Sequence, residues 1–324
     1  MNSKRPADLR VVMAQQAFLV GDIRCNTRKV VEICEHARDV LAADLVVFPE
    51  LTLTGYPPED LLFRPHFIEH VEAAVESLRQ HLRGITAIVG YPQGHRDVLY
   101  NVAGVFQDGD DTVYRKQQLP NYGVFDEKRY FTAGDQPCVV AIRDIQVGLT
   151  VCEDVWEPGP VQQAVAAGAQ LLVNINASPF HAGKRAQREQ LLGQLAQDSG
   201  IPMVYVNLVG GQDELVFDGA SFVVGRDGAV TQRAPACESG SFVVDFDGDS
   251  SITPRAGPCE PHEVEVAAIY RVLVLGVRDY INNNGFSGAV LGLSGGVDSA
   301  LTLAIAVDAI GADRVEAVMM PSRY

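Results

Sequence analysis

The sequence is short of positive charge. Its 324 residues include 26 Lys or Arg and 41 Asp or Glu, which gives a formal net charge of −15 at pH 7. Nucleic-acid backbones are bound by clustered Lys and Arg, so this composition argues against a nucleic-acid-binding surface. Any phosphate site in the chain is therefore expected to be local and to consist of backbone N–H groups.

Long apolar runs and paired cysteines are also missing. No segment approaches the roughly 20 consecutive apolar residues of a membrane span, and the start, MNSKRPADLRVVMAQQ, lacks the apolar run of a signal peptide. The six cysteines form no CxxC pair and no His cluster has metal-ligand spacing, which leaves a zinc site without support. We therefore predict a cytoplasmic protein with reduced thiols, no membrane association and no permanently bound metal.

What the sequence does contain is the pattern of a layered α/β protein. Apolar residues make up 47% of the chain and charged residues 21%, as in globular proteins generally. Short apolar runs alternate with amphipathic stretches, so strands and helices are expected to alternate. Strands are predicted at residues 11–14, 45–48, 87–89, 102–106, 146–151, 171–175, 203–207, 220–233 (broken by a turn at 226–228) and 240–246. Helices are predicted at residues 30–41, 67–82 and 184–197.

The pattern breaks at DGDSSITPRAGPCEP, residues 247–261, which has three prolines and no periodicity. After it, the sequence predicts a helix over 264–281, a strand over 289–293, a helix ending at 310 and a strand over 315–320. We assign residues 1–250 to a first domain, 251–262 to a linker and 263–324 to a second domain. Because two strands and two helices cannot cover both faces of a parallel sheet, the second domain is expected to be incomplete.

Three side chains in the first domain are candidates for chemistry. Cys152 follows the strand-like IQVGLTV, and a nucleophile at a strand-to-helix turn lies near backbone N–H groups that can receive an oxyanion. Glu50 ends the run LVVFPE, and Lys116 lies in the apolar-flanked stretch VYRKQQLPNYG. Taken singly, each has an ordinary alternative: a buried structural cysteine, a solvated glutamate at a strand end and a surface lysine.

Together, the segments FPELTLTGYPPEDLL, RKQQLPNYGVFDEKRYF and VCEDVW resemble the catalytic segments of the nitrilase (carbon–nitrogen hydrolase) superfamily. The residues in these segments are most similar to those of the glutaminase domain of the glutamine-dependent NAD synthetase family, and the resemblance covers residues 9–324. The resemblance implies a nitrilase-type αββα sandwich and a triad in which Glu50 is the base, Lys116 stabilises the oxyanion and Cys152 attacks the side-chain amide of glutamine. Glu127 resembles a second carboxylate that orients the lysine.

Residues that bind glutamine are implied by the same resemblance. Tyr122, Ser178 and Lys184 match positions that contact glutamine in the family, and an ammonium group suits the α-carboxylate of an amino acid. Tyr56 and Trp156 are candidates for the walls of the pocket, although simple packing aromatics are an equally good interpretation.

A second motif, GLSGGVDS, lies between a predicted strand and a predicted helix. A glycine pair in that position lets backbone N–H groups approach phosphates. The string lacks the GxxxxGK[ST] form and resembles the pyrophosphate loop of ATP-dependent adenylating enzymes. We therefore expect the first part of a Rossmann-like adenine-nucleotide domain, with Mg²⁺ arriving with the nucleotide near Asp298. The predicted ATP-binding residues are Gly292, Leu293, Ser294, Gly295, Gly296, Val297, Asp298 and Ser299.

The two motifs together predict a ligase. The resemblance implies that glutamine is hydrolysed to glutamate and ammonia, that ATP adenylates deamido-NAD, and that the ammonia then converts the adenylate to NAD. It also implies that the protein is a homo-oligomer. If the 324 residues are the whole polypeptide, weak or absent NAD synthesis is expected. Two alternatives stay open: a stand-alone amidase or carbamoylase, which turnover of other small amides would favour, and a non-enzymatic scaffold, in which Cys152 would resist a glutamine-like electrophile.

Overall fold

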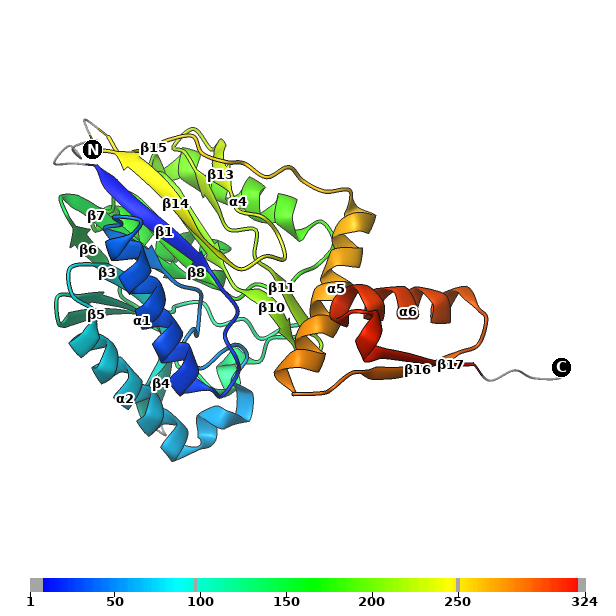
Figure 1. Ribbon diagram of the computed structural model, residues 1–324. Helices are drawn as coiled ribbons and strands as arrows, with labels where there is room; N and C mark the ends of the chain where they lie inside the picture. Colours follow the sequence, from blue (N-terminus) through cyan, green and yellow to red (C-terminus); the bar gives the residue numbers. More distant parts are fainter. Residues whose placement is uncertain (1–7, 96–97, 249–250, 320–324) are drawn as a thin grey trace.

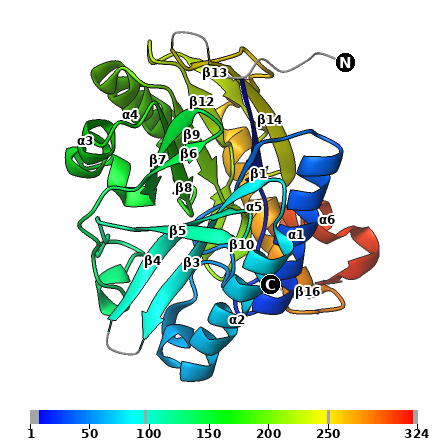
Figure 2. The ribbon, with the colours of Figure 1, turned by 90° about the vertical axis from the view of Figure 1, so that its left-hand side faces the viewer.

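The computed structural model of the chain describes residues 8–95, 98–248 and 251–319, and most of it is a four-layer sandwich (Figures 1 and 2). Within these residues the strands form one sheet of seven, one of six and two of two. The first sheet has the order β15 (Thr253–Pro254), β14 (Gly240–Asp247), β1 (Leu9–Gln15), β2 (Leu45–Val47), β3 (Thr86–His95), β4 (Val98–Gln107), β5 (Asp110–Arg115). The second has the order β13 (Val230–Arg233), β12 (Phe222–Val224), β9 (Met203–Asn207), β8 (Leu171–Asn176), β7 (Ile145–Val151), β6 (Val139–Ile142).

Two pairs of helices cover the outer faces of the sheets. The first sheet is covered by α1 (Ile23–Asp39) and α2 (Pro65–His81), and the second by α3 (Pro158–Ala166) and α4 (Lys184–Ser199). Figure 2 shows the layers in sequence, with α3 and α4 on one side and α1 and α2 on the other. The αββα sandwich predicted from the sequence is confirmed.

Strand β1 illustrates how the sequence builds these layers. Val11 and Met13 pack between the two sheets, whereas Val12 and Ala14 pack in the cluster that α1 and α2 complete. Successive side chains of a strand point to opposite faces, and both faces are buried here. A strand covered on both sides therefore reads as a continuous apolar run, which is why the central strands were recognisable in the sequence.

Parallel pairing brings the ends of several strands to one edge. Strands β1, β2 and β3 are parallel to one another, as are β7, β8 and β9 in the other sheet. Glu50 follows β2, Cys152 follows β7 and Ala177 follows β8. The amide nitrogen of Glu50 lies 3.4 Å from the carbonyl oxygen of Asn176, so the carboxyl ends of the two sheets meet at this point.

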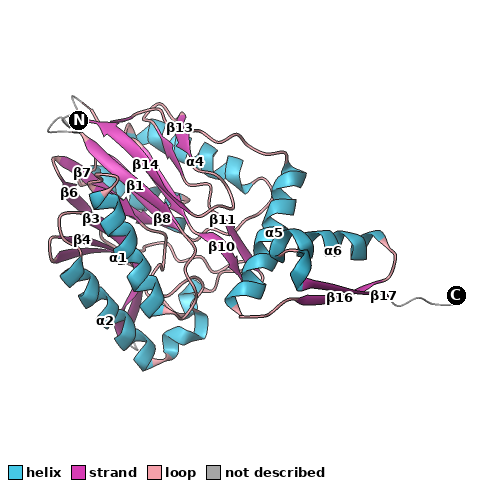
Figure 3. Ribbon diagram, in the orientation of Figure 1, coloured by secondary structure: helices cyan, strands magenta, loops and turns pink. Residues whose placement is uncertain are grey.

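The remaining residues extend away from the sandwich (Figure 3). They comprise α5 (Glu265–Asn283), β16 (Ala289–Leu293), α6 (Val297–Ile310), the 3₁₀ turn η4 (Ala312–Arg314) and β17 (Val315–Met319), with β16 and β17 paired in parallel. Helix α5 packs on the hairpin of β10 (Val209–Gln212) and β11 (Leu215–Asp218). The backbones approach closely there, because a Cβ on Gly211 would lie 3.0 Å from the Cα of Gly276. The amide of Gly211 also donates to Asp279 Oδ2 at 2.8 Å.

The sequence-predicted strands and helices are present, with ends shifted by a few residues, and residue 320 lies outside the described part. Periodicity did not predict β5, β6, β10, β11 or α3. Strand β5, DDTVYR, buries only Tyr114 fully, so it carries no apolar run. Helix α3 begins with Pro-Gly-Pro, which reads as a turn although proline is well tolerated in a first helical turn.

The segment predicted as a linker, residues 251–262, contains β15, which extends the seven-stranded sheet, and a bridge between Cys259 and Arg233. The boundaries at 1–250, 251–262 and 263–324 remain predictions. Each helix in the described ranges is too short or too polar to span a bilayer.

Candidate active site

Lys116 lies between two buried carboxylates at the edge where the sheets meet. Its Nζ is 2.7 Å from Glu50 Oε1 and 2.8 Å from Glu127 Oε1. Lys116 and Glu50 are fully buried, and Glu127, the first residue of the 3₁₀ turn η2 (Glu127–Arg129), is 5% exposed. A buried charge is tolerated only when it is paired and hydrogen-bonded, so these three side chains hold one another in place.

Burial and neighbouring charge set the protonation of the cluster. Burial alone would lower the pKa of Lys116, but Glu127 and Glu50 raise it well above its usual value, so the side chain stays an ammonium. Burial raises the pKa of Glu127 to about 7, with Lys116 acting in the opposite direction and Glu50 in the same one. Glu127 is therefore the member of the cluster that titrates near neutral pH.

Cys152 is held at the end of β7 in an unusual backbone conformation. It begins the 3₁₀ turn η3 (Cys152–Val155), has a φ of 46° and is 6% exposed. Burial raises the pKa of its thiol well above the usual value, Glu50 raises it further and Lys116 lowers it. The thiol is thus protonated at rest and lies within electrostatic reach of both other triad candidates. Its attack on a substrate requires a base at the moment of reaction.

Further contacts orient Glu50. Asn101 Nδ2 donates to Oε1 at 2.7 Å, and the amide nitrogen of Ala177 donates to Oε2 at 3.0 Å. Gly90 allows the turn that carries Glu50 to pass close to β3, because a Cβ there would lie 2.4 Å from the amide nitrogen of Leu51. Asn101 was missed in the sequence, although an asparagine inside the apolar strand VLYNVAGVF is a usable signal.

Two of the three residues predicted to bind glutamine contact side chains that closely follow Cys152 in the chain. Tyr122, 58% exposed, donates its hydroxyl to Glu153 Oε1 at 2.8 Å, and Lys184 Nζ lies 3.8 Å above the ring centre of Trp156. These contacts place both side chains on the turn that follows the nucleophile. Ser178 follows Ala177, and its hydroxyl accepts a hydrogen bond from Arg188 at 3.0 Å.

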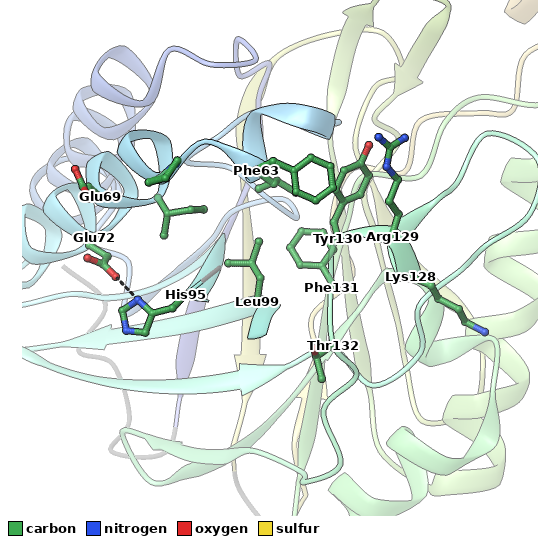
Figure 4. Close-up of a pocket in the computed structure, with 13 residues that line it drawn as sticks. Phe63, Glu69, Glu72, His95, Leu99, Lys128, Arg129, Tyr130, Phe131 and Thr132 are labelled. Carbon is green, nitrogen blue, oxygen red and sulfur yellow. Dashed lines mark ion pairs between the residues drawn. The ribbon is translucent and has the colours of Figure 1, made fainter. Parts of the chain in front are cut away.

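A cavity of about 240 Å³ adjoins the cluster, and Glu127 is among its lining residues. Tyr56 also lines it; this ring is 5% exposed, and its hydroxyl lies 3.4 Å from Glu127 Oε1. Tyr56 thus contacts Glu127 of the buried cluster, whereas Trp156 packs under the ammonium of Lys184. A different cavity, of about 950 Å³, lies between α2 and residues 128–132 (Figure 4). No member of the predicted triad lines it.

The predicted phosphate loop has the expected strand–loop–helix setting. Ser294, Gly295 and Gly296 connect β16 to α6, and Gly295 has a φ of 88°, which favours glycine. Ser299 Oγ donates to the carbonyl oxygen of Gly296 at 2.9 Å. Gly292 and Leu293 end β16, while Val297 and Asp298 begin α6. The loop lies on the far side of α5 from the sandwich (Figure 1).

With this geometry in view, the chain belongs to the carbon–nitrogen hydrolase family, whose model matches residues 10–253. A model of NAD synthase matches residues 269–324. The resemblance seen in the sequence is confirmed.

Among the relatives is a glutamine-dependent NAD(+) synthetase from Xanthomonas campestris pv. campestris, 48% identical, with 98% of this chain and 58% of the relative covered. The structure of a glutamine-dependent NAD+ synthetase from Acinetobacter baumannii, in complex with ADP, is similar with a TM-score of 0.94 and 42% identity, over 98% of this chain and 60% of the other. The chain therefore spans about three fifths of the length of these relatives.

The structure of a smaller enzyme matches about three quarters of the chain. An amidase from Nesterenkonia sp. has a TM-score of 0.69 and 30% identity, over 77% of this chain and 94% of the amidase. In a mutant of that amidase, the acetamide moiety of fluoroacetamide is covalently added at the active-site cysteine. Among the residues described here, no three His, Cys, Asp or Glu side chains are placed to hold a metal ion.

The titration of Glu127 gives a testable pH dependence. As the pH falls through about 7, Glu127 gains a proton and loses the charge that binds Lys116, so kcat/KM for amide hydrolysis is expected to fall on the acid side. Glu127→Gln imitates the protonated form and is expected to lower kcat/KM at pH 8 by at least about tenfold. The pH profile of the variant should lack the acid limb; an unchanged limb would assign it to another group.

Proposed function

We propose that this chain hydrolyses glutamine through Cys152 and acts in glutamine-dependent NAD synthesis. The observation that carries the proposal is the Lys116 ammonium held by Glu50 and Glu127, with all three charges acting on the pKa of the Cys152 thiol. Its occurrence in one chain with the SGGVDS loop supports a reaction that produces ammonia for a second, ATP-dependent step.

The chemistry of the first half follows from the charges. Glu50 accepts the thiol proton as the sulfur of Cys152 attacks the side-chain carbonyl carbon of glutamine. Lys116 stabilises the oxyanion of the tetrahedral intermediate, and Glu127 keeps the lysine oriented. Glu50 returns the proton to the leaving nitrogen, and ammonia departs from the glutamyl thioester. Water, deprotonated by Glu50, then attacks the thioester, which yields glutamate and the free thiol.

Glutamine fits the charge pattern around the nucleophile. Its α-carbon carries an ammonium and a carboxylate, and the turn after Cys152 carries the Glu153 carboxylate with the Lys184 ammonium close by. Lys184 suits the α-carboxylate, while Glu153 suits the α-ammonium. Tyr122, bonded to Glu153, and Ser178 would complete the polar contacts. A small uncharged amide has no charged groups that could pair with Lys184 and Glu153.

The Gly-rich loop fits the phosphates of ATP. The N-cap of α6, Gly296, makes no side-chain cap, so the first N–H groups of the helix remain available to an anion. Asp298 would hold Mg²⁺ that arrives with ATP. The deamido-NAD carboxylate then attacks the α-phosphorus and releases pyrophosphate, and ammonia displaces AMP to form the carboxamide of NAD. The loop residues from Gly292 to Ser299 are proposed to bind the nucleotide.

Two further features belong to the same proposal. All six cysteines are free, which supports a cytoplasmic location. The family resemblance supports a homo-oligomer, and sedimentation of the protein would measure its order.

Removal of the nucleophile tests the glutaminase directly. Cys152→Ala is expected to lower ammonia release from glutamine by at least about 10³-fold, because no other group can form the thioester. Cys25→Ser, which changes a half-buried cysteine on α1, is the matched control and should keep near-normal turnover. The wild-type protein, but not the Cys152→Ala variant, should also be alkylated by a diazoketone analogue of glutamine, and should gain the mass of that analogue less the N₂ that leaves when the sulfur–carbon bond forms. Turnover of acetamide with glutamine inert would instead indicate a stand-alone amidase.

The role of Lys184 is separable from the chemistry. Lys184→Met keeps a flexible apolar stem over Trp156 but removes the ammonium, so KM for glutamine should rise by at least about tenfold. The value of kcat should change by less than about threefold, because Lys184 does not contact the reacting atoms. Steady-state kinetics will show the difference, and a loss confined to kcat would refute glutamine binding by this side chain.

A further inference from the structure

Asp154 is a fully buried carboxylate two residues after Cys152, and it accepts hydrogen bonds from several donors. Its Oδ1 accepts from the amide nitrogens of Gln117 at 3.0 Å and Gln118 at 2.8 Å. Its Oδ2 accepts from the Tyr114 hydroxyl at 2.8 Å and from the amide nitrogen of Val151 at 2.9 Å. Each carboxylate oxygen is therefore engaged twice.

These donors come from two segments that carry catalytic candidates. Tyr114, Gln117 and Gln118 lie on either side of Lys116, at the end of β5 in the seven-stranded sheet. Val151 directly precedes Cys152 and ends β7 in the six-stranded sheet. One carboxylate thus joins the backbone around the lysine to the backbone around the thiol, across the junction of the two sheets.

The contact also restrains the nucleophile itself. Cys152 has a φ of 46°, which is uncommon for a residue with a side chain and persists only where its surroundings enforce it. The carboxylate of Asp154 accepts a hydrogen bond from the amide nitrogen of Val151, the residue before Cys152, while Asp154 itself lies in the turn that follows Cys152. The strained residue is consequently held from both sides.

Burial is unfavourable for such a carboxylate. It raises the pKa of Asp154 to about 6, while the donated hydrogen bonds from Val151 and Gln118 act to lower it. Among the hydrogen bonds of the described residues, those to Asp154 come from neutral donors and none from a Lys or Arg side chain. These hydrogen bonds offset part of the cost of desolvation, so the pKa of Asp154 stays at about 6 and the buried carboxylate is ionised at neutral pH.

We propose that Asp154 is a positioning residue that fixes the separation between the Lys116 ammonium and the Cys152 sulfur. The inference rests on the proposed function, because the separation matters only if both groups act on one oxyanion. A carboxylate is required for the task, since it can accept from both segments at once. An amide in its place has only one acceptor oxygen, so its NH₂ group would face N–H donors on one of the two sides.

The experiment compares Asp154→Asn with Asp44→Asn. Asp44 also joins the two sheets, accepting from the Arg10 amide at 2.8 Å and from Arg143 Nη1 at 3.0 Å, but it precedes β2 and so lies at the opposite end of that strand from Glu50. We expect Asp154→Asn to lower kcat for glutamine by about 10- to 100-fold with KM within about twofold, because small displacements of catalytic groups have effects of this size. Asp44→Asn should keep kcat within about twofold, even though both variants are expected to lower the thermal midpoint of the protein.

A second measurement is independent of glutamine turnover. The rate of Cys152 alkylation by iodoacetamide, followed by peptide mass spectrometry, should fall at least about fivefold in Asp154→Asn and stay unchanged in Asp44→Asn. If the wild-type protein fails to hydrolyse glutamine, the proposed function is wrong, and the alkylation rates still decide the role of Asp154. If Asp154→Asn does not fold, Tyr114→Phe removes one donor without changing the packing and should show a smaller loss in the same direction. Equal kinetics and equal alkylation in the aspartate variants would overturn the inference.

Discussion

The candidate active site depends on one buried ammonium group that is shared by two carboxylates. Lys116 neutralises part of the charge of Glu50 and Glu127, and without it two carboxylates would repel each other in a medium of low polarity. The same arrangement requires all three segments to be brought to one sheet edge. The sandwich achieves this because parallel strands end together there.

This constraint explains why the thiol is not ionised at rest. A site that already carries an excess of negative charge does not favour a thiolate, and burial acts in the same direction. In the reaction that we propose, the cluster instead moves a proton from the sulfur to Glu50 and on to the departing nitrogen. In that proposal, the thiol of Cys152 is deprotonated only when substrate is bound. A protonated thiol is also less reactive toward general oxidants between turnovers.

Much of the fold could be predicted, and the three residues of the proposed triad could be singled out, because both have distinctive patterns in the local sequence. Central strands are continuous apolar runs, and the triad residues stand in distinctive segments. The supporting residues leave weaker marks. Asn101 donates to Glu50, which is 51 positions away, and three of the four donors to Asp154 are 36 to 40 positions away. Such pairings are set by how the strands are arranged in the sandwich rather than by spacing along the chain. Edge strands such as β5 also escape recognition, because a mostly polar strand lacks periodic burial.

The contact between α5 and the β10–β11 hairpin has a consequence for how the two halves of the chain can diverge. Gly211 and Gly276 face each other with no side chain between them, and a methyl group on Gly276 would lie 2.9 Å from Val216. The distance between α5 and the hairpin is thus set by the thickness of the two main chains. A larger residue at either position would push α5 away from the hairpin. Few substitutions are therefore tolerated at this contact, even though neither glycine takes part in chemistry.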